Sequence, residues 1–401
     1  MKIVLSIVRI LVGLLFIFSG LIKANDPLGL SYKMQEFFEV WGWNGWNDYT
    51  LPLSMILISF EIIAGVAVLL GWQFRIFSWL LLLLILCFSF LTGYAVLSGK
   101  IRECGCFGDC IKLTAKESFV KDLVLLGSIL FLFVFRNRVQ PVFHTAANLV
   151  ILLLSAVFSF SLQWYVLKHL PVVDCLPYKA GNNILEKMKI PPGAIPDSTV
   201  ITFVYRKNSK ETEFTADKFP ADFSDSSYQF VRRYDKVVRK GNAEPAIKDF
   251  VLLAEDGTDF TQEFLSEPGY QLLLFLKDGY HQDDWPAVLE MVMQSARQKN
   301  IPGFIITNIP LEQLRDDSKQ LLKMMFPLRS DVTAIKTAAR TNPALYLIKQ
   351  GTIIKKWGYA DFELALQEIQ NLAGNPSTEP IAPATDSLNN APAKSDSIMK
   401  K

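Results

Sequence analysis

The sequence predicts an all-α bundle of five transmembrane helices, followed by a C-terminal α/β domain. Half of its 401 residues are hydrophobic, and the long apolar runs all lie before about residue 170. From about residue 190 the pattern changes to short strands, turns and amphipathic helices. The chain is too long for one ordinary domain. Its net charge of only +2, without a basic stripe, argues against nucleic acid as a partner.

Five apolar runs are each close to the roughly 20 residues that a helix needs to cross a bilayer. No small-residue cleavage site follows the first run, so we expect a retained helix rather than a cleaved signal peptide. The stretch Lys23 to Pro27 is expected to form a loop behind it. The runs cover residues 3–22, 52–71, 76–97, 119–135 and 145–167.

The orientation rests on the short connections between these runs. Residues 72–75 and 136–144 are dense in arginine, which favours the cytoplasmic side, although the longer loops also carry lysines. We therefore expect a multi-pass protein of the bacterial inner membrane. Five crossings would place the cysteines and the C-terminal domain outside the cytoplasm, where disulfides persist. Trp41, Trp43 and Trp46 in the first long loop predict a helix or belt at headgroup level.

Ionisable residues also lie within or at the ends of the runs. A charge in hydrocarbon costs at least about 2.5–3.5 kcal/mol, so each should pair, lose its charge or face water. Glu61 is the strongest functional candidate, because a buried carboxyl can hold a proton near neutral pH. It could serve a transport site, or lock two helices together with Arg9 or Lys23 as partner. Asp122 opens the fourth run, and Cys87 is expected to be a packing residue.

Three of the five cysteines fall within seven residues, Cys104-Gly-Cys-Phe-Gly-Asp-Cys110, between the third and fourth runs. A bridge from Cys104 or Cys106 to Cys110 is the easiest disulfide, and the remaining thiol could attack it. Cys175, after the fifth run, could resolve that bridge or pair with a loop cysteine. Three interpretations stay open: a permanent disulfide, thiol–disulfide exchange, or a thiolate metal site. The metal site is the least favoured, because paired zinc ligands usually have wider spacing.

These motifs, taken in order, resemble the DoxX-like superfamily and, within it, the MauE branch of methylamine-utilisation membrane proteins. The resemblance covers residues 1–140 and implies a four-helix membrane core with a part in maturing a disulfide-rich partner outside the cytoplasm. It does not imply methylamine as a substrate, because residues 141–170 add a fifth helix and a large domain follows. A quinone stays open as an electron partner. The motifs are Arg9 to Lys23, Glu61 before Gly65 and Gly71, Cys104-Gly-Cys-Phe-Gly108, and Lys121-Asp122.

The C-terminal half predicts two further regions. Residues 171–244 form a connecting segment with a hairpin, and residues 245–372 a domain whose order of elements resembles the thioredoxin-like fold. Asn342-Pro343 stands where that family has its cis-proline. The expected elements are a hairpin over 200–205 and 210–214, strands within 245–257 and over 271–276 and 304–307, helices over 285–298, near 311–325 and over 362–372, and a hairpin over 344–349 and 352–357.

This domain departs from the family at the place of its redox chemistry. Where the family keeps Cys-X-X-Cys, the sequence reads Lys277-Asp-Gly-Tyr-His-Gln-Asp-Asp-Trp285. A domain without thiols cannot exchange disulfides by itself, so we expect a redox-inactive binding module. His281, Asp283 and Asp284 are interpreted as a solvated helix start rather than a catalytic or metal site. Residues 373–401 are rich in Pro, Ser and Thr and predict disorder.

Together these features predict an accessory or assembly factor linked to thiol–disulfide chemistry, with the lipid bilayer and an extracytoplasmic client protein as partners. We expect a non-enzyme, or otherwise a thiol–disulfide oxidoreductase that uses Cys104, Cys106, Cys110 and Cys175. The alternatives are a scaffold with a structural disulfide loop and a small-molecule transporter that uses Glu61.

Overall fold

The structure is a computed structural model, and the chain divides into two compact units. One unit comprises Met1–Asn182 with Val251–Lys401, and the other comprises Asn183–Phe250. The structure describes residues 2–101, 105, 107–111, 113–196, 198–207, 210–215, 218–220, 223, 227–239, 241, 243–248, 250–277, 285–310, 313 and 322–376.

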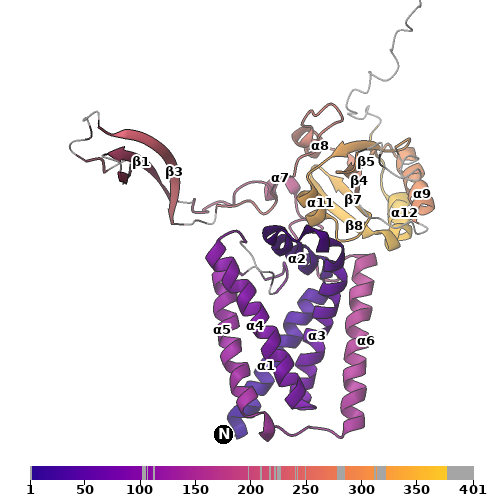
Figure 1. Cartoon of the computed structure of the whole chain (residues 1–401). Coiled ribbons are helices and arrows are strands. Elements are labelled where there is room, and N and C mark those ends of the chain that lie inside the picture. Colours follow the sequence, from indigo (N-terminus) through magenta and orange to yellow (C-terminus); the bar gives the residue numbers. More distant parts are fainter. Residues whose placement is uncertain are drawn as a thin grey trace, which may run out of the picture. The chain divides into compact units, whose positions relative to one another are not determined.

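Five long helices make up the N-terminal part of the first unit (Figure 1). Among the described residues, four segments are long and apolar enough to cross a membrane: α1, α3 with the turn before it, α4 and α6. The remaining helix, α5, carries Lys116, Glu117, Lys121 and Asp122 in its first half, so a fifth span stays a prediction. The helices are α1 (Lys2–Ala24), α3 (Thr50–Leu70), α4 (Phe74–Ser98), α5 (Ala115–Val134) and α6 (Thr145–His169).

Helices α1 and α3 pack at close range because glycines face each other. A Cβ added to Gly65 would lie 2.8 Å from the carbonyl oxygen of Gly13 and 2.8 Å from the side chain of Ile17. Small residues at such a crossing let the two backbones approach. Around the crossing, α1, α3, α4 and α5 bury one apolar cluster that includes Val12, Phe16, Val68, Leu81, Ile85 and Ile129.

The first long loop contains a helix, α2 (Pro27–Trp41), followed by the short turn η1 (Asn44–Tyr49). Asp26 caps α2 by accepting a hydrogen bond from the backbone N–H of Gly29, and Pro27 occupies the first turn. The prediction of a loop over residues 23–27 was therefore too long, since only Asn25 and Asp26 separate α1 from α2.

The C-terminal part of the first unit is an α/β domain on a five-stranded sheet, in the order β6-β5-β4-β7-β8. β4 (Tyr270–Leu276), β5 (Gly303–Thr307) and β6 (Phe326–Arg329) are parallel, whereas β7 (Ala344–Lys349) and β8 (Thr352–Gly358) are antiparallel to their neighbours. Helices α9 (Trp285–Gln298) and α12 (Phe362–Asn371) share one buried cluster with the sheet. The shorter helices are α8 (Thr261–Ser266) and α11 (Val332–Ala338).

Most predicted elements of this domain are confirmed to within one or two residues. The exception is the strand within residues 245–257, where Leu253 forms only isolated bridges, to Asp259 and Arg329. The chain turns there at Gly257, whose φ of +85° suits glycine. β6 and α11 have no counterpart in the sequence prediction. The predicted helix near 311–325 lies mostly outside the described residues.

The second unit is a three-stranded antiparallel sheet in the order β2-β1-β3. The predicted hairpin is confirmed by β1 (Ser198–Lys207) and β2 (Lys210–Thr215), whereas the third strand, β3 (Gln229–Arg239), was missed. A short helix, α7 (Ile184–Lys187), precedes the sheet. Aromatic rings pack together around Tyr205, namely those of Phe214, Phe219, Phe223 and Phe230.

Candidate functional site: a membrane cavity and a disulfide junction

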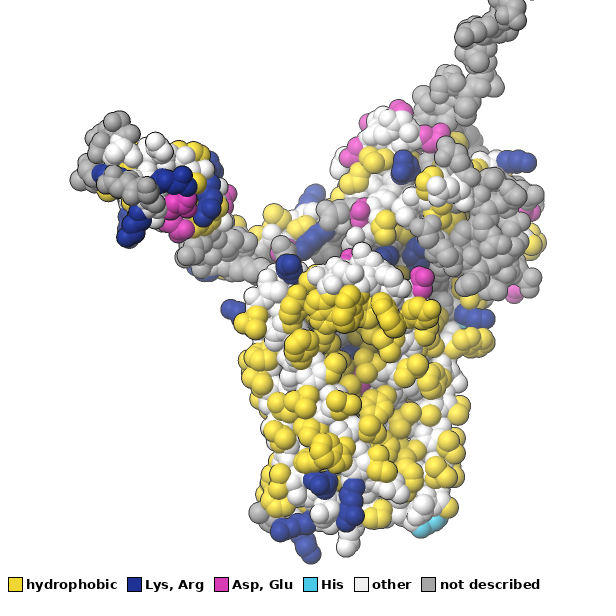
Figure 2. Space-filling model, in the orientation of Figure 1, with side chains coloured by type: hydrophobic (Ala, Val, Ile, Leu, Met, Phe, Trp, Pro, Cys, Tyr) yellow, Lys and Arg dark blue, Asp and Glu magenta, His cyan; other side chains and the backbone are white. Residues whose placement is uncertain are grey.

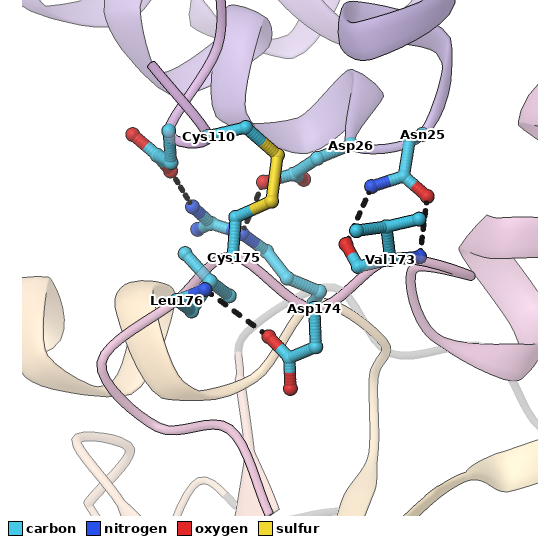
Figure 3. The surroundings of a disulfide bond; sticks show 9 residues. Asn25, Asp26, Cys110, Val173, Asp174, Cys175 and Leu176 are labelled. Carbon is cyan, nitrogen blue, oxygen red and sulfur yellow. Dashed lines mark hydrogen bonds and ion pairs between the residues drawn. A yellow bond between two sulfur atoms is a disulfide. The ribbon is translucent and has the colours of Figure 1, made fainter. Parts of the chain in front are cut away.

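A disulfide joins Cys110 of the cysteine loop to Cys175 in the segment after α6 (Figure 3). The two Cα atoms are 4.8 Å apart, and both residues are half-buried. Of the pairings considered from the sequence, the structure shows Cys175 with a loop cysteine, and it corrects the expectation that Cys110 would bridge Cys104 or Cys106. Cys104 and Cys106 lie outside the described part of the chain. Spacing along the sequence favours a disulfide between cysteines that are close in the chain, whereas the fold brings together two cysteines that are 65 positions apart.

The segment that carries Cys175 is fixed against the start of α2. Asn25 donates its side-chain N–H to the carbonyl oxygen of Val173 at 2.7 Å, and the Val173 N–H donates back to Asn25 Oδ1 at 2.9 Å (Figure 3). On the other side of the cysteine, the Leu176 N–H donates to Asp174 Oδ1 at 3.2 Å. The segment is therefore fixed to Asn25 just before Cys175, and the backbone turn around Cys175 is held by Asp174.

A buried arginine of the α/β domain reaches the same junction. The Arg340 side chain is only 5% exposed, and its Nε donates to Asp26 Oδ2 at 2.8 Å, while Nη2 donates to Asp109. Burial works against the charged guanidinium, yet Asp26 and Asp109 hold the pKa of Arg340 above its ordinary value. Burial likewise raises the pKa of Asp26, against the effect of Arg340. One guanidinium thus connects the α2 cap, the neighbour of Cys110 and the sheet.

A second contact joins α2 to the end of β4. Lys277 donates its ammonium to Tyr32 Oη at 3.0 Å and to the carbonyl oxygen of Ala339 at 2.7 Å. Burial, reinforced by Arg340, lowers the pKa of Lys277 to about 7, and burial raises the pKa of Tyr32 to about 12. Lys277 stands at the start of the stretch expected, from the sequence, to take the place of the Cys-X-X-Cys of the thioredoxin-like fold. The following residues, with His281, Asp283 and Asp284, lie outside the described part of the chain.

The loop before β7 completes this edge of the domain. Asn342 accepts a hydrogen bond from the Lys277 N–H at 2.9 Å and donates to the Lys277 carbonyl oxygen at 3.0 Å. The Asn342–Pro343 peptide bond is cis. The edge formed by the end of β4 and this loop therefore faces α2 of the same chain.

Helices α1 to α5 enclose a cavity of about 280 Å³. In its wall Glu61, 1% exposed, is paired with Lys23 at 2.6 Å and accepts a hydrogen bond from Ser19 at 3.2 Å. A second polar group is formed by Asp122, which accepts a hydrogen bond from Thr92 at 3.0 Å and is paired with Lys121 at 2.8 Å. The rest of the wall is mostly apolar and includes Leu15, Phe16, Leu57, Ile85, Phe88 and Leu125.

The cavity and the cysteine loop lie in a region that matches the model of a known protein family. Residues 1–135 match the family model of the methylamine utilisation protein MauE. With the four apolar helices, the match indicates a MauE-type multi-pass membrane region and supports the resemblance seen in the sequence. Residues 199–240 match a domain of unknown function, DUF8463. No curated protein and no solved structure matches the chain.

The MauE-type region thus contains the cavity and Cys110, whereas Cys175 and Arg340 lie beyond it. The structure pairs Glu61 with Lys23, one of the two partners considered from the sequence. Arg9 lies instead near the α3–α4 turn, with its Nη1 2.9 Å from the place of a Cβ on Gly71. Among the described residues, no cluster of His, Cys, Asp or Glu could hold a metal ion.

Sequence reasoning missed the residues of the junction. Asp26-Pro27 is a recognisable helix start, so the cap of α2 had a signal. Tyr32, Asp109 and Arg340 had none, because each is an ordinary surface residue until its distant partner is known.

Proposed function

We propose that the protein is an accessory membrane factor of thiol–disulfide chemistry, with Cys110–Cys175 as the disulfide that a client protein's thiols reduce. The observation that carries the proposal is this bond, because it connects a cysteine-rich membrane loop to a second, distant segment. Both cysteines are half-buried rather than enclosed. Cys104 and Cys106 precede Cys110 by a few positions and supply further thiols for exchange.

The step that we propose conserves atoms and electrons. A client thiolate attacks one sulfur of the disulfide and displaces the other as a thiolate, which gives a mixed disulfide. The second client thiol then attacks the mixed disulfide. The client ends with a disulfide, and Cys110 and Cys175 end as two thiols, so two electrons and two protons have moved from the client to this protein.

In this proposal the C-terminal domain is a thioredoxin-like module that binds rather than reacts. Its sheet order, with β4 and β5 parallel and β7 and β8 antiparallel, agrees with that resemblance. All five cysteines of the sequence lie at or before Cys175, so the domain has no thiol. Its edge around Lys277 and Arg340 contacts α2 and Asp109, so this edge positions the disulfide-bearing segments.

Trapping in intact cells tests the proposal. Cys110→Ser and Cys175→Ser each leave one thiol, which can attack the disulfide of an oxidised client and displace a client thiolate. The variant has no second thiol to release the resulting mixed disulfide, so we expect adducts of higher mass after quenching with a thiol reagent. These adducts should disappear on reduction. Cys87→Ser is the matched control and should give none, since Cys87 lies outside the disulfide.

Folding is checked separately, because removing a disulfide can destabilise a protein by about 2–5 kcal/mol. The double variant Cys110→Ser with Cys175→Ser should reach the membrane and keep a thermal transition without giving adducts. The proposal fails if neither single variant gives an adduct and if, in the unaltered protein, Cys110–Cys175 stays oxidised when thiols are added. The bond is then a structural disulfide and the protein is a scaffold.

A further inference from the structure

The cavity formed by helices α1 to α5 opens onto the outer surface of the helical bundle. Two residues of its wall, Leu53 and Cys87, are also exposed on the outside of the bundle. Hydrophobic side chains cover the visible face of this helical region (Figure 2). In a bilayer such a surface faces hydrocarbon, so a ligand would enter from the membrane and must itself be lipophilic.

The polar groups in the wall indicate a ligand with polar atoms of its own, rather than a plain acyl chain. Glu61 and Asp122 are almost fully buried, and because ionisable residues inside a membrane are energetically costly, they usually mark a ligand or ion pathway. Lys23 supplies N–H donors beside Glu61, Thr92 donates to Asp122, and Phe88 supplies an aromatic face. The wall therefore suits a lipophilic ring that carries hydrogen-bond acceptors and takes up protons.

The same cavity touches the cysteine loop. Gly105 lines the cavity, and the Phe107 ring lies 6.1 Å from the Phe18 ring of α1. The Lys121 ammonium, also in the wall, lies 5.1 Å from the centre of the Phe107 ring. The loop that ends in Cys110 thus forms part of the wall, so a ligand in the cavity contacts the loop that carries Cys110.

We propose that this cavity binds a lipid-soluble quinone, which restores the Cys110–Cys175 disulfide after a client has reduced it. The inference rests on the proposed function for the source of its electrons. The two thiols lose two electrons and two protons and form the S–S bond again. The quinone gains both and leaves as the quinol, with Glu61 and Asp122 positioned to pass protons to its oxygens.

Protection of Cys87 measures binding in the full-length protein. A membrane-permeant maleimide labels this thiol, and mass spectrometry separates it from the other cysteines. A short-chain ubiquinone is the probe, because its fully substituted ring does not add thiols. At ten times its Kd it should slow labelling about tenfold. A saturated fatty acid of similar length should protect less; equal protection by both, or none by the quinone, would overturn the proposal.

Two variants locate the site. Thr92→Val removes the hydrogen bond that holds Asp122 in the wall with little change in shape, and should raise the Kd for the quinone about fivefold. Ser128→Ala is the matched control, because its hydroxyl bonds the carbonyl oxygen of Val124 within α5, on the exposed side. If the quinone protects Cys87 from the maleimide less well in Thr92→Val than in Ser128→Ala, the cavity is supported as the site. An equal change in both variants contradicts it.

Re-oxidation separates this inference from the proposed function. Protein reduced beforehand should regain Cys110–Cys175 when the quinone is added without oxygen, with quinol appearing in equal amount. If this occurs but no client adduct can be trapped, the proposed function fails and the quinone site stands. If adducts form but the quinone neither protects Cys87 nor restores the disulfide, the quinone site fails alone.

Discussion

Buried charged side chains determine the energetics at the junction between α2 and the α/β domain. Arg340 is bonded to the carboxylates of both Asp26 and Asp109. Losing one member of a buried pair costs about 3–5 kcal/mol, because the remaining charge is left without a partner. This site could not be predicted from the sequence. Asp26 and Arg340 are 314 positions apart, and no local pattern links them.

Lys277 makes the stability of this junction depend on pH. Its pKa is about 7 in the folded chain against 10.5 for an ordinary lysine. Between these values the unfolded state binds one proton more, so the free energy of unfolding rises with pH. Below about pH 7 both states are protonated and the contribution is constant. The contribution of Lys277 should therefore raise the thermal midpoint of the full chain as pH increases from about 7 toward about 10.

The difference between the protein and Lys277→Met isolates this contribution from all other titrating groups. The variant keeps a long side chain but cannot carry charge. Its midpoint minus that of the unaltered protein should therefore be larger at about pH 7 than at about pH 10. Lys179→Met, which alters an exposed lysine, should leave the pH curve unchanged. Parallel curves for the protein and Lys277→Met would show that Lys277 keeps its charge when buried.

At the scale of elements, prediction succeeded where a pattern runs through a whole strand or helix. β4 is buried from Gln271 to Leu276, and its continuous apolar run shows this in the sequence. β6 has only four residues, one of them Pro327, so neither alternation nor an apolar run is long enough to show. The strand expected around Leu253 failed for a different reason. Leu252 and Ala254 are buried, but within the described part of this segment only Leu253 forms β-bridges, and these are isolated.

The crossing of α1 and α3 gives a prediction that concerns the packing of whole helices. Gly65→Ala would place a Cβ 2.8 Å from the Gly13 carbonyl oxygen and 3.0 Å from the Ile17 N–H. Both are backbone atoms that a rotamer change cannot move, so the helices must separate. Overpacking of this kind costs about 1–3 kcal/mol. We expect a lower thermal midpoint in detergent for the full chain.

Gly127→Ala is the matched control for this substitution. Gly127 lies in α5, and a Cβ there would meet nothing within 4 Å. Alanine favours helix over glycine by up to about 1 kcal/mol, so this variant should be neutral or more stable. A fall of equal size in both variants would show that glycine is needed for reasons other than the α1–α3 contact.

For the whole molecule, the disulfide requires Cys110 and Cys175 to share one compartment. Counting apolar runs in the sequence led to the same expectation, since an odd number of crossings puts the cysteine loop and the end of α6 on one side. The count depends on α5, whose first half is rich in charged residues. Lys116 and Glu117 are exposed at the end near the cysteine loop, whereas Asp122 is buried in the cavity wall, and the remaining turns of α5 are apolar.

The position of the α5–α6 turn decides the matter. If α5 crosses, Asn137 in this turn lies on the opposite side of the membrane from Lys100, which follows α4 and precedes the cysteine loop, and Arg136 and Arg138 beside Asn137 favour the cytoplasm. Both Asn137 and Lys100 are exposed, so a cysteine at either position should react freely. In intact spheroplasts a membrane-impermeant maleimide should label Lys100→Cys but not Asn137→Cys, and permeabilised membranes should allow both. Labelling of both from outside would place α5 along the membrane surface and leave four spans, which would separate Cys110 from Cys175 unless another segment also changes sides.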